Sequence, residues 1–210
     1  MTEISPEYRS EVTRKAVHLI GLAIPIGYVL VPDEWVARGI LIALMVVVVA
    51  VDIWRLRRPR FHRFLLGLGG AIMRPHEKAD LLGSTCLLIA STMTVLIFPK
   101  GVAVGALCLL IGGDTAAALV GRRFGRIKVF GAKTLEGTLA FIGTGLALNL
   151  AVGWILPRLA PGIASLSPMA AVVGALVGGL VEAVPFPVDD NFAIPILSGV
   201  AMVLTEIIGA

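Results

Sequence analysis

This sequence has few charged residues, few aromatic residues and only two cysteines. Charged residues make up 15% of its 210 positions, against about a quarter in an average soluble domain. Hydrophobic residues make up 57%, and the mean hydropathy is +0.93. These values argue against a soluble globular protein and indicate an integral membrane protein, because a spanning helix needs about 20 mostly apolar residues.

The scarce residue types exclude several classes of protein. Cys86 and Cys108 both lie in apolar runs, which argues against a disulfide scaffold or a cysteine metal site. An aromatic content of 6% makes a long aromatic ligand platform improbable. The polar start, "MTEISPEYRSEVTRK", does not resemble a signal peptide, so we expect the first hydrophobic run to be retained.

The hydrophobic runs predict an all-α integral membrane protein with about seven transmembrane helices in a single domain over residues 1–210. Basic residues followed by a short apolar stretch predict an interfacial helix near residues 57–75. The predicted spans are Val17–Val31, Trp35–Ile53, Leu81–Phe98, Gly101–Val120, Leu135–Leu156, Met169–Val184 and Phe192–Ile208.

The lysines and arginines are distributed unequally between the two sides of these spans. Fifteen of the 18 lie in the N-terminus and in the loops 54–80, 121–134 and 185–191. Since cytoplasmic loops carry the excess of these residues, we expect a cytoplasmic N-terminus and an external C-terminus. The net charge of +4 follows from these flanking residues, and we expect no nucleic-acid partner. In a prokaryote the membrane would be the plasma membrane.

Ionisable residues near the spans are the main functional candidates, because charge at membrane depth is costly. Glu11, Arg14, Lys15 and His18 repeat at helical spacing and form one stripe. Arg14 and Lys15 fit basic anchors at the membrane surface, whereas His18 lies beyond that zone. A second group, around Glu77 before the third span, is compatible with helix capping and interfacial charge.

The fourth span and the loop after it combine a carboxylate with several cations. Asp114 lies inside the span after two glycines, where a carboxylate needs a cation, a partner or water. A structural ion pair is one alternative. After the basic loop, Lys133 and Thr134 lead into a helix start where backbone N–H groups favour an anion. The residues of this region that we select are Arg122, Arg123, Thr134, Glu136 and Gly137.

The stretch "PFPVDDNFAIP", from Pro185 to Pro195, is acidic although the other loops on its side are basic. Glu182 precedes it at the end of the sixth span. An ordinary turn rich in Asp and Asn is one interpretation. The other is an irregular segment that lines a cavity, because irregular backbone at membrane depth is tolerated only where it is buried or lines one.

Together, cations and carboxylates on one side of a membrane favour phosphate and magnesium chemistry. The motifs that support this are "RKAVH", "RPHE", "GDTAAALVGRRFG", "KTLEGTLAF" and "EAVPFPVDDNFAIP", in that order. This ordered set resembles the CTP-dependent polyprenol and lipid kinase family, which includes dolichol kinases, phytol kinases and the yeast-type diacylglycerol kinase. The chain is most similar to the compact phytol-kinase-like form.

The resemblance implies transfer of a phosphoryl group from CTP, with Mg²⁺ or Mn²⁺, to the hydroxyl of a membrane prenol or polyprenol at the cytoplasmic face. No base-reading motif separates CTP from ATP, and the alcohol and the oligomeric state stay open. The roles it implies are metal binding by Asp114, Asp190, Glu136 and Glu182; nucleotide binding by Lys133, Arg122, Arg123, Thr134, Gly137 and Asn191; catalysis by Asp114, Asp189, Asp190, Lys133 and Glu136; and a lipid cavity lined by Arg14, His18 and Glu77.

Three alternatives stay open at this point. A CTP:phosphatidate cytidylyltransferase shares the membrane setting and a similar glycine–aspartate feature, but this sequence has no H-G-G segment. A transporter would use charges near the middle of the membrane and internal repeats, whereas here the charges gather at one face. A non-catalytic membrane subunit would use the small residues of "GVAVG" and "GALVG" for helix packing.

Overall fold

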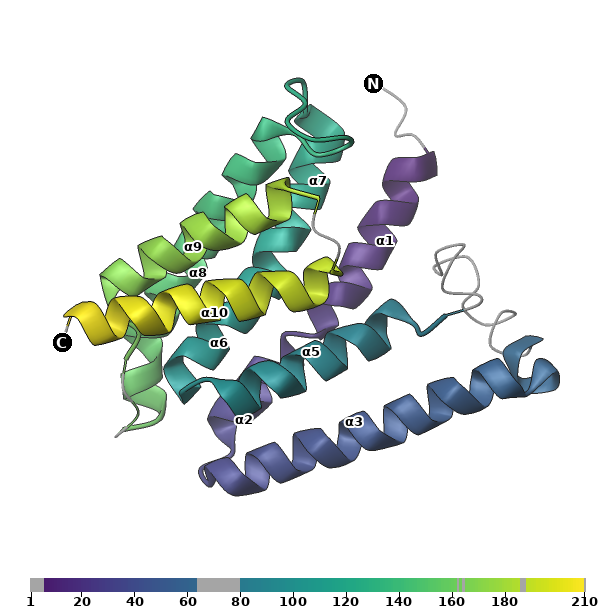
Figure 1. Ribbon diagram of the computed structural model, residues 1–210, viewed down its shortest axis with the longest axis horizontal. Coiled ribbons are helices and arrows are strands. Elements are labelled where there is room, and N and C mark those ends of the chain that lie inside the picture. The colour runs from purple at the N-terminus through teal and green to yellow at the C-terminus, as the bar shows by residue number, and fades with distance from the viewer. Residues whose placement is uncertain (1–5, 64–79, 162, 164, 186–187, 210) are drawn as a thin grey trace.

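The computed structural model describes residues 6–63, 80–161, 163, 165–185 and 188–209. Within these residues every regular element is a helix, and the β-type pairing is limited to one isolated bridge, between Lys128 and Thr134. The predicted all-α class is confirmed. The helices are α1 Pro6–Ile20, α2 Ala23–Leu30, α3 Glu34–Arg57, α5 Gly83–Ile97, α6 Lys100–Cys108, a π-helical turn Leu109–Gly113, α7 Asp114–Phe124, α8 Leu135–Leu159, α9 Pro168–Ala183 and α10 Asp190–Gly209 (Figure 1).

In the part of the chain that the structure describes, four helical segments are long and apolar enough to cross a membrane. They are α3, α8, α10 and the continuous segment Lys100–Phe124 that joins α6 to α7. Helices α5 and α9 are apolar but shorter, with 15 and 16 residues. The structure therefore supports an integral membrane protein, while seven spans and the orientation of the termini stay predictions.

The prediction of one continuous helix over residues 17–31 is wrong. The chain turns at Gly21, so that the polar helix α1 is separated from the short apolar helix α2. A Cβ atom at Gly21 would lie 2.9 Å from the carbonyl oxygen of His18 and 2.9 Å from Cδ2 of Leu87. The turn therefore depends on glycine, and hydropathy alone cannot distinguish it from an uninterrupted helix.

The predicted interfacial helix near residues 57–75 lies mostly outside the described residues. Residues 59–63 are helical and follow directly after α3. The predicted cavity residue Glu77 also lies outside the described part of the chain.

The segment from α6 to α7 forms the centre of the bundle (Figure 1). Of its apolar stretch 78% is buried, against 17% in α3, which lies at the edge. Helix α8 packs against α7 and α9, α9 packs against α10, and α1 packs mainly against α7. The most enclosed helix is therefore the one that carries Asp114.

A π-helical turn precedes Asp114 in this central segment. Such turns widen a helix locally and often occur at functional sites. Gly112 and Gly113 let α8 approach closely here: a Cβ at Gly112 would lie 2.3 Å from Leu148 Cδ1, and one at Gly113 would lie 3.0 Å from the ring of Phe141. The two glycines before Asp114 thus bring α7 and α8 together beside the carboxylate.

Candidate functional site

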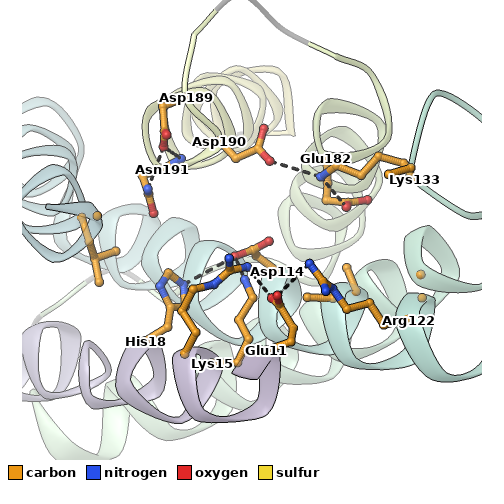
Figure 2. Close-up of a pocket in the computed structure, with 18 of the residues that line it drawn as sticks. Glu11, Lys15, His18, Asp114, Arg122, Lys133, Glu182, Asp189, Asp190 and Asn191 are labelled. Carbon is orange, nitrogen blue, oxygen red and sulfur yellow. Dashed lines mark hydrogen bonds and ion pairs between the residues drawn. The ribbon is translucent and has the colours of Figure 1, made fainter. Parts of the chain in front are cut away.

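A cavity of about 550 Å³ lies where α1, α5, α7, α8, α9 and α10 approach one another. Figure 2 shows that charged side chains enter it from two opposite walls. The α1/α7 wall carries Asp114, and the α8–α10 wall carries Lys133, Glu182 and Asp190. The predicted site residues that line the cavity are Arg14, His18, Asp114, Arg122, Lys133, Thr134, Gly137, Glu182, Asp189, Asp190 and Asn191.

The α1/α7 wall is built by the polar stripe of α1. Helical spacing places Glu11, Lys15 and His18 on one face, and this face packs against α7. Lys15 donates a hydrogen bond to Asp114, and Nε2 of His18 lies 3.6 Å from Oδ2 of the same carboxylate. The cation that a buried carboxylate needs is therefore supplied by a residue 99 positions earlier in the sequence.

Glu11 organises the other end of this wall. It is almost completely buried, with 3% of its surface exposed. It forms ion pairs with Arg14 and Arg122, and Oε2 of Glu11 lies 2.8 Å from Nη2 of Arg122. Glu11 thus ties α1 to the end of α7 and holds two guanidinium groups at the rim of the cavity.

The α8–α10 wall is organised by Lys133, which comes just before α8. Its Nζ atom donates to Oε1 of Glu182 over 2.7 Å and to Oδ2 of Asp190 over 3.1 Å. Burial disfavours the charge, but the hydrogen bond with Glu182 and the charges of both carboxylates raise the pKa of Lys133 above its usual value. Lys133 therefore carries its positive charge at neutral pH and links the start of α8 to α9 and α10.

The two adjacent aspartates before α10 have different partners. Oδ1 of Asp189 accepts hydrogen bonds from the backbone N (2.8 Å) and from Nδ2 (2.6 Å) of Asn191. Asp190 begins α10 and turns to Lys133. Asp189 and Asn191 therefore form a turn, and Asp189, Asp190 and Asn191 also line the cavity, so both interpretations hold in part for these three residues.

Thr134 sits at the junction of α7 and α8. Its hydroxyl oxygen accepts a hydrogen bond from the backbone N of Gly137 over 3.2 Å and caps α8. A Cβ at Gly137 would lie 2.9 Å from the carbonyl oxygen of Ala117, so glycine is needed for this close contact. The capped helix start adds positive potential beside Lys133.

Two predicted site residues, Arg123 and Glu136, do not line this cavity. The guanidinium of Arg123 lies over the rings of Tyr8 and Phe124, at 5.9 and 5.5 Å. The carboxylate of Glu136 accepts hydrogen bonds from the backbone nitrogens of Arg126 (3.0 Å) and Ile127 (3.3 Å). Glu136 thus supports the loop and Arg123 lies against aromatic rings of α1 and α7, and the proposed site includes neither residue.

The four carboxylates predicted to share a metal ion are not gathered in one place. Asp114 faces Glu182 and Asp190 from the opposite wall, and Glu136 lies outside (Figure 2). Among the described residues no three Asp, Glu, His or Cys side chains form a metal site. Glu182 and Asp190 still fit Mg²⁺ that arrives with a nucleotide, because such an ion needs only one or two protein carboxylates.

Two residues of this cavity, Lys15 and Glu11, have roles that the sequence does not predict. Lys15 fits a surface anchor by its position in the sequence, yet only 5% of its surface is exposed and it pairs with Asp114. Glu11 was given no role, although it holds Arg14 and Arg122. The helical stripe containing both residues was visible, but its spacing does not show which helix it faces.

Comparisons with known proteins show the family to which the chain belongs. The chain is 32% identical to a CTP-dependent diacylglycerol kinase 1 of Eremothecium gossypii, over 92% of this chain and 67% of that protein. It is 30% identical to the protein of the same name from Schizosaccharomyces pombe, over 73% of each chain. The chain belongs to the CTP-dependent lipid kinase family. This family member is also 31% identical to the Saccharomyces cerevisiae CTP-dependent diacylglycerol kinase 1, over 77% of this chain.

The chain spans 61% of the length of its Saccharomyces cerevisiae relative. No family model matches the chain, and no solved structure matches it. Membership in the family therefore rests on the fungal relatives, and the arrangement of the site rests on the structure.

Proposed function

We propose that the protein is a lipid kinase that transfers the γ-phosphate of CTP to the hydroxyl of a lipid alcohol in the bilayer. The observation that carries the proposal is the pair of charged walls that face each other across one cavity (Figure 2). Three relatives are named CTP-dependent diacylglycerol kinases. Diacylglycerol is therefore the first substrate to test, before the prenols and polyprenols expected from the sequence.

The charge balance of the walls supports a division of labour. On the α1/α7 wall, the guanidinium groups of Arg14 and Arg122 both pair with the single carboxylate of Glu11 at the rim of the cavity. We assign the phosphate groups of CTP to its rim, since guanidinium groups match phosphate oxygens in a bidentate geometry.

On the α8–α10 wall, the charge balance has the opposite sign. Glu182 and Asp190 together face one ammonium group, that of Lys133. These two carboxylates would hold Mg²⁺ together with the nucleotide. When bound, the ion neutralises the charge that develops on the transferring phosphoryl group. Lys133 donates a hydrogen bond to each of the two carboxylates and supplies a further positive charge.

In the proposed reaction the lipid oxygen forms a bond to the γ-phosphorus of CTP. The bond from that phosphorus to the bridging oxygen breaks, and CDP leaves with the electron pair. The hydroxyl proton passes to a carboxylate, for which we propose Asp189, because Oδ2 of Asp189 makes no hydrogen bond within the described residues. The pair of His18 and Asp114 would orient the hydroxyl from the opposite wall.

The test uses purified protein in lipid nanodiscs with dioleoylglycerol and CTP labelled at the γ-phosphate. We expect labelled phosphatidate that requires Mg²⁺. Parallel reactions with γ-labelled ATP and with a prenol identify the donor and the alcohol. Absence of a labelled lipid with every donor and alcohol would contradict the proposal.

CTP labelled at the α-phosphate separates this function from its nearest rival. A kinase leaves the α-label in CDP, whereas a CTP:phosphatidate cytidylyltransferase transfers it to the lipid. Label in the lipid from α-labelled CTP and phosphatidate would therefore identify a cytidylyltransferase.

A further inference from the structure

One wall of the cavity is apolar and has no role in the phosphoryl transfer described above. It consists of Val17 from α1, Leu82 just before α5, Leu87 from α5, and Ala117 and Ala118 from α7. A triphosphate gains nothing from such a surface. An apolar wall that continues from a charged site instead matches a substrate with one polar and one apolar part.

Helices α1 and α5 form a V around this wall (Figure 1). They touch at its closed end, where a Cβ at Gly21 would lie 2.9 Å from Cδ2 of Leu87. Away from this contact α1 packs mainly against α7, and the described parts of α1 and α5 diverge. Val17 and Ser84 line the cavity on the two arms of the V.

The arms of the V also face outward. Val17 lines the cavity although 45% of its surface is exposed, and Ile20, one turn further along α1, is 70% exposed. In a membrane protein, exposed apolar side chains of this kind mark a surface that meets lipid. Val17 is therefore in contact with the cavity on one side and with the surroundings of the bundle on the other.

The polar groups of the α1/α7 wall lie directly beyond this apolar edge. His18 is the next residue after Val17, and its Nε2 lies 3.6 Å from Oδ2 of Asp114. A lipid that passed Val17 with its hydroxyl leading would meet this pair first. The order of the residues from the outside inward, apolar and then polar, matches the order of groups in a lipid alcohol.

We infer that the V between α1 and α5 is the lipid subsite, in which Val17 and Leu87 contact the acyl chains of the substrate while its hydroxyl reaches His18 and Asp114. This inference rests on the proposed kinase function and adds to it the side from which the alcohol enters. CTP then approaches from the opposite side of the cavity, at Arg122 and Lys133, so that the two substrates meet without crossing.

Photocrosslinking tests this subsite without relying on activity. A photoreactive benzoylphenylalanine replaces Val17 in one variant and Leu19 in a matched control. Leu19 is two residues, or about 200°, further around α1, is 39% exposed and does not line the cavity. The probe is radiolabelled dioleoylglycerol in nanodiscs of phosphatidylcholine.

We expect the probe to label the variant at Val17, and unlabelled dioleoylglycerol to compete with it. Labelling at Leu19 should follow the bulk lipid concentration without saturation. Equal labelling at both positions, or labelling at Val17 that unlabelled dioleoylglycerol does not reduce, would overturn the inference.

A second variant covers the case in which the bulky probe blocks the subsite. Leu87→Trp narrows the V, and we expect the KM for dioleoylglycerol to rise about tenfold, the scale of altered apolar contacts in a binding pocket. The KM for CTP should stay unchanged. An equal rise in both values would show a general structural effect and would count against the subsite.

The two proposals fail in different ways. Competed labelling at Val17 without transfer of the γ-phosphate would leave the subsite standing and reject the kinase function. Phosphate transfer by the wild type together with uncompeted labelling at Val17 would reject the subsite alone.

Discussion

Lys15 donates a hydrogen bond to Asp114, and this contact joins the first helix of the chain to its most buried one. Both side chains are largely enclosed, with 6% and 17% of their surfaces exposed. A buried ion pair of this kind is costly to break on one side, because the remaining charge loses its partner. The pair therefore serves both the fold and the proposed site.

The first prediction concerns this pair. Lys15→Met should destabilise the protein by about 3–5 kcal/mol, since it leaves Asp114 as an uncompensated buried charge. The double variant Lys15→Met/Asp114→Asn should regain much of that stability, because neither charge remains. Thermal unfolding in detergent measures both effects.

Activity should not follow stability in the double variant. If Asp114 orients the lipid hydroxyl, Lys15→Met/Asp114→Asn stays inactive although it is folded. Full lipid phosphorylation by that double variant would show that the pair is purely structural.

The second prediction concerns the charge on Lys133. Burial opposes this charge, but the carboxylates of Glu182 and Asp190 outweigh the effect and raise the pKa of Lys133 above its ordinary value of 10.5. A raised pKa means that the favourable charge is fully present below pH 10.5 and is lost only as the pH rises through the folded value. The contribution of Lys133 to the KM for CTP should therefore be constant between about pH 7 and pH 10.

Replacing Lys133 by an uncharged residue measures its contribution to the KM for CTP. Lys133→Met should raise the KM for CTP at every pH in that range, and Lys128→Met, an exposed lysine of the same loop, should leave it unchanged. A KM that responds equally to both substitutions would mean that general loop charge, and not the position of Lys133, attracts the nucleotide.

The third prediction concerns Arg122 and Arg123, which are both expected from the sequence to bind the nucleotide but differ in their position relative to the cavity. Arg122→Gln should raise the KM for CTP about tenfold, the effect of losing ~1.4 kcal/mol of binding free energy. Arg123→Gln should have little effect, because Arg123 lies over aromatic rings outside the cavity. Steady-state kinetics at varied CTP check this, and equal losses would support the original assignment of both residues.

The fourth prediction compares two glutamates with respect to magnesium. Glu182→Gln should increase the Mg²⁺ concentration needed for half-maximal activity, because Glu182 is one of the two carboxylates proposed to hold the ion. Glu136→Gln is the matched control, since Glu136 bonds to backbone nitrogens outside the cavity. Magnesium titrations at fixed CTP distinguish the two, and a shift only in Glu136→Gln would reverse the assignment.

The fifth prediction concerns Asp52, a buried polar residue that does not line the cavity. Oδ2 of Asp52 accepts hydrogen bonds from the backbone N of Leu82 and from Oγ1 of Thr85, both over 2.8 Å. Oδ1 of Asp52 accepts from Nε of Arg55 over 2.5 Å. These bonds hold the start of α5, which forms part of the cavity wall.

Asp52→Asn should therefore lower the melting temperature and raise the KM for the lipid more than the KM for CTP. Measurements of both KM values on one preparation test this. Asp33→Asn is a suitable control, because Asp33 caps α3 at its other end and asparagine preserves such a cap. A larger effect of Asp52→Asn on CTP would contradict a role in positioning the lipid wall.

Much of the fold could be predicted because hydrophobic runs report directly on membrane helices. The predicted runs over residues 35–53, 101–120, 135–156 and 192–208 all fall within long apolar helices. The run at residues 17–31 gave a wrong prediction of one uninterrupted helix. The turn at Gly21 brings the chain close to Leu87, and this residue is distant in sequence.

The candidate site could be predicted in part, for a similar reason. Polar residues stand out in an apolar chain whatever its fold. The sequence alone therefore indicates Asp114, Lys133, Glu182 and Asp190 as candidate site residues. Their grouping could not be predicted, because ion pairs between helices depend on how the helices are rotated. Asp52 could not be selected in this way, since its partners besides Arg55 of the same helix, Leu82 and Thr85, lie 30 and 33 residues further along the chain.

The sequence by itself determined that this protein is helical, that it is built for a membrane, and which motifs it shares with lipid kinases. These properties depend on composition, local periodicity and order along the chain, all of which can be read in one dimension. Only the tertiary structure decided that Lys15 pairs with Asp114, that Lys133 joins Glu182 to Asp190, and that Glu136 and Arg123 stay outside. Such contacts depend on helix packing across long separations, and side-chain volume and the glycines at close contacts decide that packing.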